Sequence, residues 1–113
     1  MPKFITIGYG DREGYERTPE PLRNAAHAHD ALLQKQGVVM GVAGPAVQVR
    51  NAEAKGICTS SGAFMSSQLP VAGFAVIDAV DMDEAIRIVS LSPCAVAHGV
   101  VEVWPLEQPG TAA

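Results

Sequence analysis

The sequence is short of cysteine, of positive charge and of long hydrophobic runs. Its two cysteines, Cys58 and Cys94, lack the spacing of a metal site, so we expect no metal and no other cofactor. Eight basic residues against twelve acidic ones leave a net charge of −4, which argues against binding to nucleic acid or to an acidic membrane surface. Because no stretch approaches the roughly 18 apolar residues of a membrane span and residues 1–11 contain no apolar signal segment, we expect a cytoplasmic protein with reduced thiols.

The remaining composition is that of an ordinary globular domain. The chain has 113 residues, of which 48% are hydrophobic and 18% are charged. A chain of this length can bury a core without disulfide or metal support, and it rarely forms two domains. We expect one domain over residues 1–106, followed by a flexible C-terminal tail over residues 107–113.

Hydrophobic periodicity and turn residues predict four main strands and two helices. The strands are expected at residues 3–9, 38–43, 71–79 and 99–104, and the helices at residues 19–36 and 82–91. A loop is expected at residues 10–17, and a small hairpin insertion at residues 47–51 and 56–59. Thr18 and Asp81 are predicted helix N-caps, and Pro93 is predicted to end the second helix.

This order of elements predicts an α+β fold, the ferredoxin-like βαββαβ arrangement with both helices on one face of an antiparallel sheet. Such a sheet normally alternates apolar and polar side chains. The strands at 38–43 and 71–79 are instead apolar on both sides. Since two helices cover only one face, we expect the other face to be covered by a second copy of the chain, in a homodimer.

Three segments together resemble the YCII-related domain family, in particular its branch named for a DGPF motif. They are residues 61–89 (SGAFMSSQLPVAGFAVIDAVDMDEAIRIV), residues 101–105 (VEVWP) and Gly44-Pro45. The resemblance implies a dimeric α+β barrel of ferredoxin-like subunits. It also implies a cleft between the first helix and the sheet, near a histidine used by some members in acid–base chemistry. Ser61 stands at the aspartate of the motif, Ala63 at its proline, and Trp104 at the arginine of the family's VEVRP ending.

Two histidines of the first predicted helix are the candidates for that chemistry, because imidazole exchanges protons near neutral pH. His29 falls near the centre of an apolar helix face, which consists of Leu22, Ala25, Ala26, Leu32 and Leu33. His27 falls on the polar side, together with Arg23, Asp30 and Gln34. The position of His29 on the apolar helix face favours His29, whereas His27 is favoured if the helix is one residue shorter than in the family. Alternatively, His29 is a core histidine bonded to the backbone and His27 is solvated.

Two other arrangements of reactive residues are less consistent with the pattern. His27 and His29 point about 200° apart on a helix, so they cannot bind one metal ion together. Cys94 with His98 has the residue types of a nucleophile and its base, but no oxyanion loop accompanies them, and a small buried thiol is the simpler interpretation.

We therefore predict a small-molecule site between the first helix and the sheet. His29 or His27 is the proton-transfer residue, Tyr9 and Ser61 are polar contacts, and Phe64 and Trp104 are apolar contacts. The alternative is a non-catalytic binding or regulatory module whose partner is a transcription-related protein. The neutral loop at residues 61–68 and the missing arginine at Trp104 favour that alternative.

Overall fold

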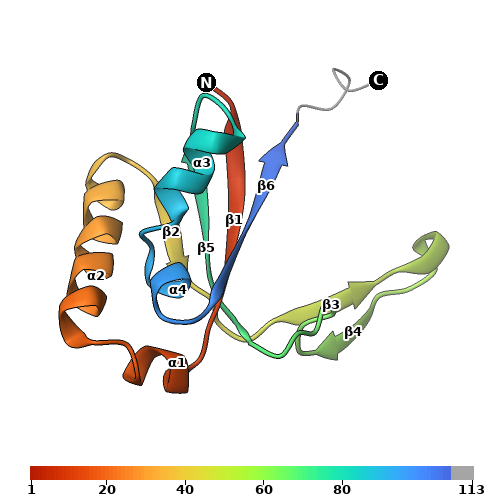
Figure 1. The fold of residues 1–113 in the computed structure, drawn as a ribbon. Helices are drawn as coiled ribbons and strands as arrows, with labels where there is room; N and C mark the ends of the chain where they lie inside the picture. Colours follow the sequence, from red (N-terminus) through yellow and green to blue (C-terminus); the bar gives the residue numbers. More distant parts are fainter. Residues whose placement is uncertain (108–113) are drawn as a thin grey trace.

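The computed structural model describes residues 1–107 and shows an α+β protein with helices on one face of an antiparallel sheet (Figure 1). Residues 108–113, which make up most of the predicted tail, lie outside the described residues. In chain order the elements are β1 (Lys3–Tyr9), α1 (Arg12–Glu16), α2 (Glu20–Lys35), β2 (Val39–Val42), β3 (Val47–Arg50), the 3₁₀ turn η1 (Ala52–Ala54), β4 (Cys58–Ser61), β5 (Val71–Asp78), α3 (Met82–Val89), α4 (Pro93–Val96) and β6 (Val100–Leu106). Among the described residues, no helix combines the length and the hydropathy that crossing a bilayer requires.

Four strands form the main sheet in the order β2-β5-β1-β6, and every neighbouring pair is antiparallel. Phe4 of β1 pairs with Ile77 of β5 on one side and with Pro105 of β6 on the other. Successive side chains of a strand point to opposite faces. Phe4 accordingly lies under the helices, and the neighbouring Ile5 points to the other face. The four predicted main strands are confirmed to within two residues at each end.

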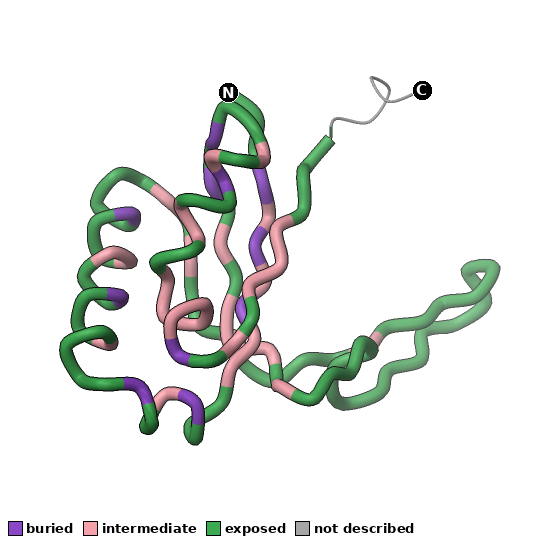
Figure 2. Tube along the Cα trace, in the orientation of Figure 1, coloured by how far each residue is buried: buried purple, intermediate pink, exposed green. Residues whose placement is uncertain are grey.

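The hydrophobic core lies between the sheet and α3. Phe4, Ile77, Ala79 and Ala85 are at most 4% exposed and form one cluster. Asp81 accepts a hydrogen bond from a backbone N–H in the first turn of α3, which confirms its predicted role as an N-cap. Figure 2 shows the buried positions on the two central strands and on the inward turns of the helices.

The long helix α2 stands off the sheet and packs mainly against α4. Ala26 and Leu33 are its only buried residues. The predicted apolar face is confirmed only in part, because Ala26 and Leu33 are buried whereas Leu22 and Leu32 are 53% and 52% exposed. The inward face of the helix contains Ala26, Asp30 and Leu33, whose spacing is that of one helix face. This stripe borders a cavity.

The segment between β1 and α2 differs from the predicted loop, because residues 12–16 form the short helix α1. Its N-cap is Asp11, whose carboxylate accepts a hydrogen bond from the Gly14 N–H at 2.9 Å. The prediction that Thr18 is the N-cap of α2 is wrong. The N-cap of α2 is Pro19, and the Thr18 hydroxyl donates to the Gly14 carbonyl at 2.8 Å. Thr18 thus fixes the end of α1 rather than the beginning of α2.

The connection between α3 and β6 also contains a helix that the sequence does not predict. α3 ends at Val89, and Pro93 begins the one-turn helix α4 instead of only terminating α3. Proline suits the first turn of a helix, because the N–H that it lacks would have no partner there. α4 brings Cys94 close to β1.

The sheet face away from the helices, which we call the open face, is apolar and uncovered in the single chain. Ile5 and Ile7 are half-buried at its centre. Its large apolar side chains that are at least one third exposed are Val39, Phe74, Val76, Val100, Trp104 and Leu106. The structure therefore has the two-faced apolar sheet that the strand sequences predict.

β3 and β4 form a separate two-stranded hairpin that reaches away from the helices (Figure 1). We call residues 46–62 the arm. The second arm strand begins two residues later than predicted, at Cys58. The radius of gyration is 16.2 Å, whereas a compact chain of this length has about 13 Å. The arm accounts for the elongated shape.

Candidate functional site

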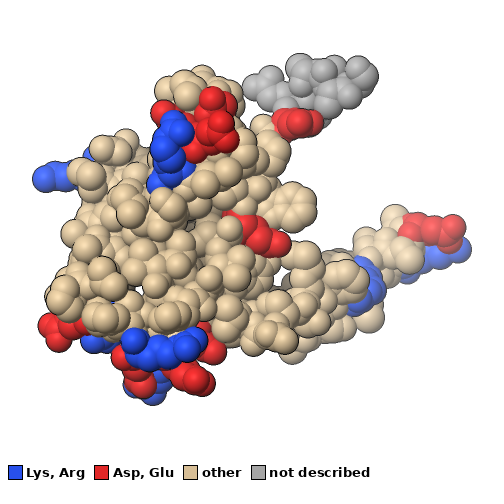
Figure 3. Space-filling model, viewed as in Figure 1, with Lys and Arg blue, Asp and Glu red and all other residues tan. Residues whose placement is uncertain are grey.

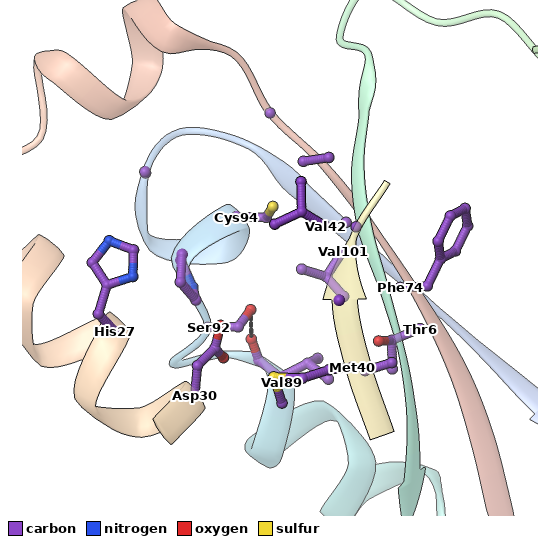
Figure 4. Close-up of a pocket in the computed structure, with 18 of the residues that line it drawn as sticks. Thr6, His27, Asp30, Met40, Val42, Phe74, Val89, Ser92, Cys94 and Val101 are labelled. Carbon is purple, nitrogen blue, oxygen red and sulfur yellow. Dashed lines mark hydrogen bonds between the residues drawn. The ribbon is translucent and has the colours of Figure 1, made fainter. Parts of the chain in front are cut away.

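A cavity of about 540 Å³ separates α2 from the sheet. His27 and Asp30 line it from α2, Cys94 from α4, and Thr6 and Met40 from the sheet (Figure 4). Most small-molecule sites have volumes of roughly 300–1,000 Å³ and are mainly apolar with a few polar groups. The structure thus contains a cavity of suitable size and character where the sequence predicts a cleft.

His27 is held on the cavity wall by Tyr15 of α1. The Tyr15 hydroxyl lies 2.8 Å from Nε2 of His27, and the two ring centroids are 5.8 Å apart. The Arg23 guanidinium carbon lies 4.9 Å from the centre of the Tyr15 ring, on the same stretch of surface. Within residues 1–107, Nδ1 of His27 makes no hydrogen bond, so this nitrogen is free to bond a ligand.

Asp30 lies one helical turn after His27, and its carboxyl group is half-buried on the same wall. No residue in the described part of the chain donates a hydrogen bond to its carboxylate. Burial raises the pKa of Asp30 above its ordinary value, and this effect outweighs the opposing influence of His29 and His27. Asp30 is therefore a second hydrogen-bond acceptor directed at the cavity without a partner from the chain.

Replacing Asp30 with asparagine is expected to stabilise the protein at pH 7. A carboxyl group whose pKa is raised by folding holds its proton more tightly in the native state. Its presence therefore lowers the free energy of unfolding as pH rises from the ordinary value of 3.8 through the raised folded-state pKa. The gain should be below about 1 kcal/mol, because solvent screens this partly exposed group. Urea unfolding at several pH values should show a difference from wild type that shrinks towards pH 4.

The matched control is Asp83→Asn, which removes the same charge from an exposed position. Asp83 lies in the first turn of α3, where a negative charge interacts favourably with the helix dipole. This variant should not gain stability at pH 7. Equal behaviour of the two variants would show that total charge, and not burial at the cavity, is responsible.

Cys94 completes the wall opposite α2 as a neutral thiol. Burial, and to a smaller extent the charge of Asp30, raise the pKa of Cys94. The sulfur lies so close to β1 that a Cβ on Gly8 would come within 2.8 Å of it. His98 is exposed on the following turn and makes no hydrogen bond with this thiol in the described structure. These contacts favour the interpretation of Cys94 as a packed thiol over an activated nucleophile.

His29 points to a different neighbour from His27. Its Nε2–H donates to the carbonyl oxygen of Ile88 on α3 at 2.7 Å, and the residue does not line the cavity. The bond connects α2 to the helix that packs over the core. Of the two candidate histidines, His27 therefore faces the cavity and His29 links two helices.

The other predicted contact residues lie elsewhere in the single chain. Tyr9 is on the open face, where its hydroxyl donates to Glu102 at 2.6 Å, and this bond, with burial and the charge of Glu102, raises the pKa of Tyr9. Trp104 lies on the same face and is 52% exposed. Ser61 is in β4 of the arm, and Phe64 follows it at 77% exposure. None of these four residues lines the cavity beside α2.

Sequence reasoning missed several polar residues of the cavity, among them Tyr15, Asp30 and Ser92. Tyr15 was missed because a loop, and not the helix α1, is predicted for this segment. Asp30 was assigned to a solvated helix face, although its spacing from Ala26 and Leu33 places it on the inward stripe. Asp11, a good N-cap three residues before Gly14, is the signal that could have indicated α1.

The comparisons with known proteins add no assignment. No family model matches the chain, and no curated protein matches it. Residues 1–107 contain no group of three or more histidine, cysteine or acidic side chains placed to hold a metal ion.

Proposed function

We propose that this protein binds a largely apolar small molecule carrying one hydroxyl or similar proton donor, and that His27 accepts the proton of that group. The observation that carries the proposal is the position of His27 on an apolar cavity wall, held by Tyr15 at 2.8 Å, with Asp30 beside it. With the His27 Nε2–H donating to the Tyr15 hydroxyl oxygen, Nδ1 of His27 is an acceptor for the ligand, and the Asp30 carboxylate is a second one. The apolar walls favour a ring or a short hydrocarbon.

The arrangement of elements supports a ferredoxin-like subunit. The sheet order β2-β5-β1-β6 follows from two strand–helix–strand units in which α2 and α3 are the connecting helices. This agrees with the resemblance to YCII-related domains, whose members are expected to have a cleft at this place. We therefore retain that family as part of the proposal.

The open face supports assembly of two copies into a dimeric α+β barrel. Its six exposed apolar side chains together present roughly 600 Å² of surface per copy. Standard-size interfaces bury about 800 Å² per partner, so this face with its half-buried neighbours is large enough for a stable dimer. An apolar patch of this size is unusual on a monomer.

Phenol and toluene form the probe pair for the cavity, because they share a shape and differ in the hydroxyl group. We expect phenol to bind about fivefold more tightly than toluene, since a hydrogen bond to an otherwise unpartnered acceptor contributes about 1 kcal/mol. Phenol should also shift the imidazole ¹⁵N resonances of His27 and not those of His29. Nuclear magnetic resonance titration of the labelled protein measures both effects.

The variant His27→Leu, which has no hydrogen-bonding group in its side chain, should lose the preference for phenol and retain weak binding of both compounds. His29→Leu is the matched control, because it removes the same ring from the same helix at a position off the cavity, and it should keep the preference. Absence of saturable binding to wild type would contradict the proposal and favour the non-catalytic module. Loss of the preference in both variants would contradict the role assigned to His27.

A further inference from the structure

The arm is a regular hairpin with no packing against the body of its own chain. Its strands pair in register from Val47 with Ser61 to Arg50 with Cys58, and residues 51–62 are all exposed. Isolated two-stranded hairpins are marginally stable in water and need a third strand or a packing surface. An ordered arm therefore implies a surface that covers it.

The two sides of the arm differ in character. Val47 and Val49 lie on one side and are 63% and 66% exposed. On the other side, Arg50 donates to Gln48 at 3.0 Å, and Gln48 donates to the backbone carbonyl of Gly62 at 3.2 Å. The polar side thus satisfies its own hydrogen bonds next to solvent, whereas the valine side leaves apolar surface unburied.

Beyond the stem, further large apolar side chains are exposed. Ile57 and Phe64 are each 77% exposed, and Met65 is 59% exposed. Charge on the arm is confined to Arg50 and to the tip, where Lys55 pairs with Glu53 at 3.0 Å. In Figure 3 acidic and basic side chains cluster around α1, around α3 and on the arm, and the surface between them is mostly uncharged, with one acidic group near its middle. The stem of the arm is thus suited to an apolar contact.

The root of the arm adjoins the open face. Residues 65–69, which lead from the arm into β5, border a hollow of about 380 Å³ together with Tyr9, Val100 and Glu102 of the open face. At its N-terminal end the arm follows β2, which is an edge strand of the same sheet. A molecule that covers the open face therefore lies next to the arm.

We infer that the valine side of the arm packs against a second copy of this chain in the dimer proposed above, on which this inference depends. Residues 46–51 extend up to roughly 20 Å at 3.3 Å per residue, and packed sheets lie about 10 Å apart. The arm is thus long enough to extend beyond the thickness of the partner's sheet and to contact the side of the partner. The contact buries Val47 and Val49 and leaves the polar side in water.

Val49→Lys tests the contact, with Gln48→Lys as the matched control on the opposite side of the same strand. Sedimentation should show that Val49→Lys raises the dimer dissociation constant at least tenfold, and that Gln48→Lys changes it less than twofold. A dimeric wild type with equal constants for both variants would overturn the role of the arm. A wild type that sediments as a single chain at micromolar concentration would instead overturn the dimer, and the arm contact with it.

A cross-linking measurement on the wild-type protein avoids substitution in the arm. Cys58 is exposed on the arm, whereas Cys94 is half-buried, so a benzophenone maleimide should label Cys58 selectively. After equilibration of ¹⁴N and ¹⁵N copies and illumination, cross-linked peptides should join the two isotopes. Cross-linked peptides that join only like isotopes would overturn the inference.

Discussion

Replacing Val76 with lysine is expected to dissociate the proposed dimer into single chains. Val76 lies inside the open face, between Ile5 of β1 and Val39 of β2, and is 36% exposed in the single chain. The single chain tolerates an ammonium group there, because the side chain can reach water. In the proposed dimer the same group is buried without a partner, at a cost of several kcal/mol.

A cost of about 3 kcal/mol corresponds to a hundredfold rise in the dimer dissociation constant. Each dimer contains two substituted copies, so both contribute to this cost. Analytical ultracentrifugation should show particles near 12 kDa for Val76→Lys and twice that mass for wild type. Circular dichroism should show the same secondary structure in both proteins. The substitution would then have changed the assembly and not the fold.

Leu32→Lys is the control for added positive charge on an exposed apolar side chain. Leu32 is 52% exposed and lies on α2, on the other side of the molecule from the open face. This variant should remain dimeric, and a lysine near the C-terminal end of a helix is favourable for the helix dipole. Dissociation of both variants would place the interface elsewhere, and an unchanged dimer in Val76→Lys would refute the sheet-to-sheet arrangement.

The main sheet was predictable because its strands carry local signals. β1 and β5 combine β-branched residues with clear turn residues at both ends, and their expected limits differ by at most one residue from the observed ones. α3 was equally readable, because Asp81 is a strong N-cap that precedes an amphipathic stretch. In these segments local preference and tertiary packing agree.

The cavity was predictable in place but not in composition. A helix is expected to turn its most apolar face inward, and for α2 that rule selects Leu22, Leu32 and Leu33. The structure instead directs a mixed stripe with Asp30 at a cavity, because α2 packs mainly against α4 and the cavity separates it from the sheet. That displacement depends on α4, a one-turn helix with no periodic signal of its own.

The position of α4 depends on a close approach at Gly99, where we expect the largest loss of stability from a single methyl group. A Cβ at Gly99 would collide with the carbonyl oxygen of Tyr9 and would lie 2.6 Å from that of Cys94. Both obstacles are backbone atoms, so a rotamer change cannot relieve them. The Gly99 N–H also donates to the Cys94 carbonyl at 2.9 Å and thereby closes the turn after α4.

Gly99→Ala should therefore lower the free energy of unfolding by about 3 kcal/mol, at the upper end of overpacking costs, and Tm by roughly 10–20 °C. Gly44→Ala is the matched control, because a Cβ there meets no atom within 4 Å, and its stability should change by less than about 1 kcal/mol. Thermal unfolding monitored by circular dichroism compares the two. Because this turn holds Cys94 against β1, any folded Gly99→Ala protein should also lose the phenol preference. A stable variant with unchanged binding would show that α4 is free to move without affecting the cavity.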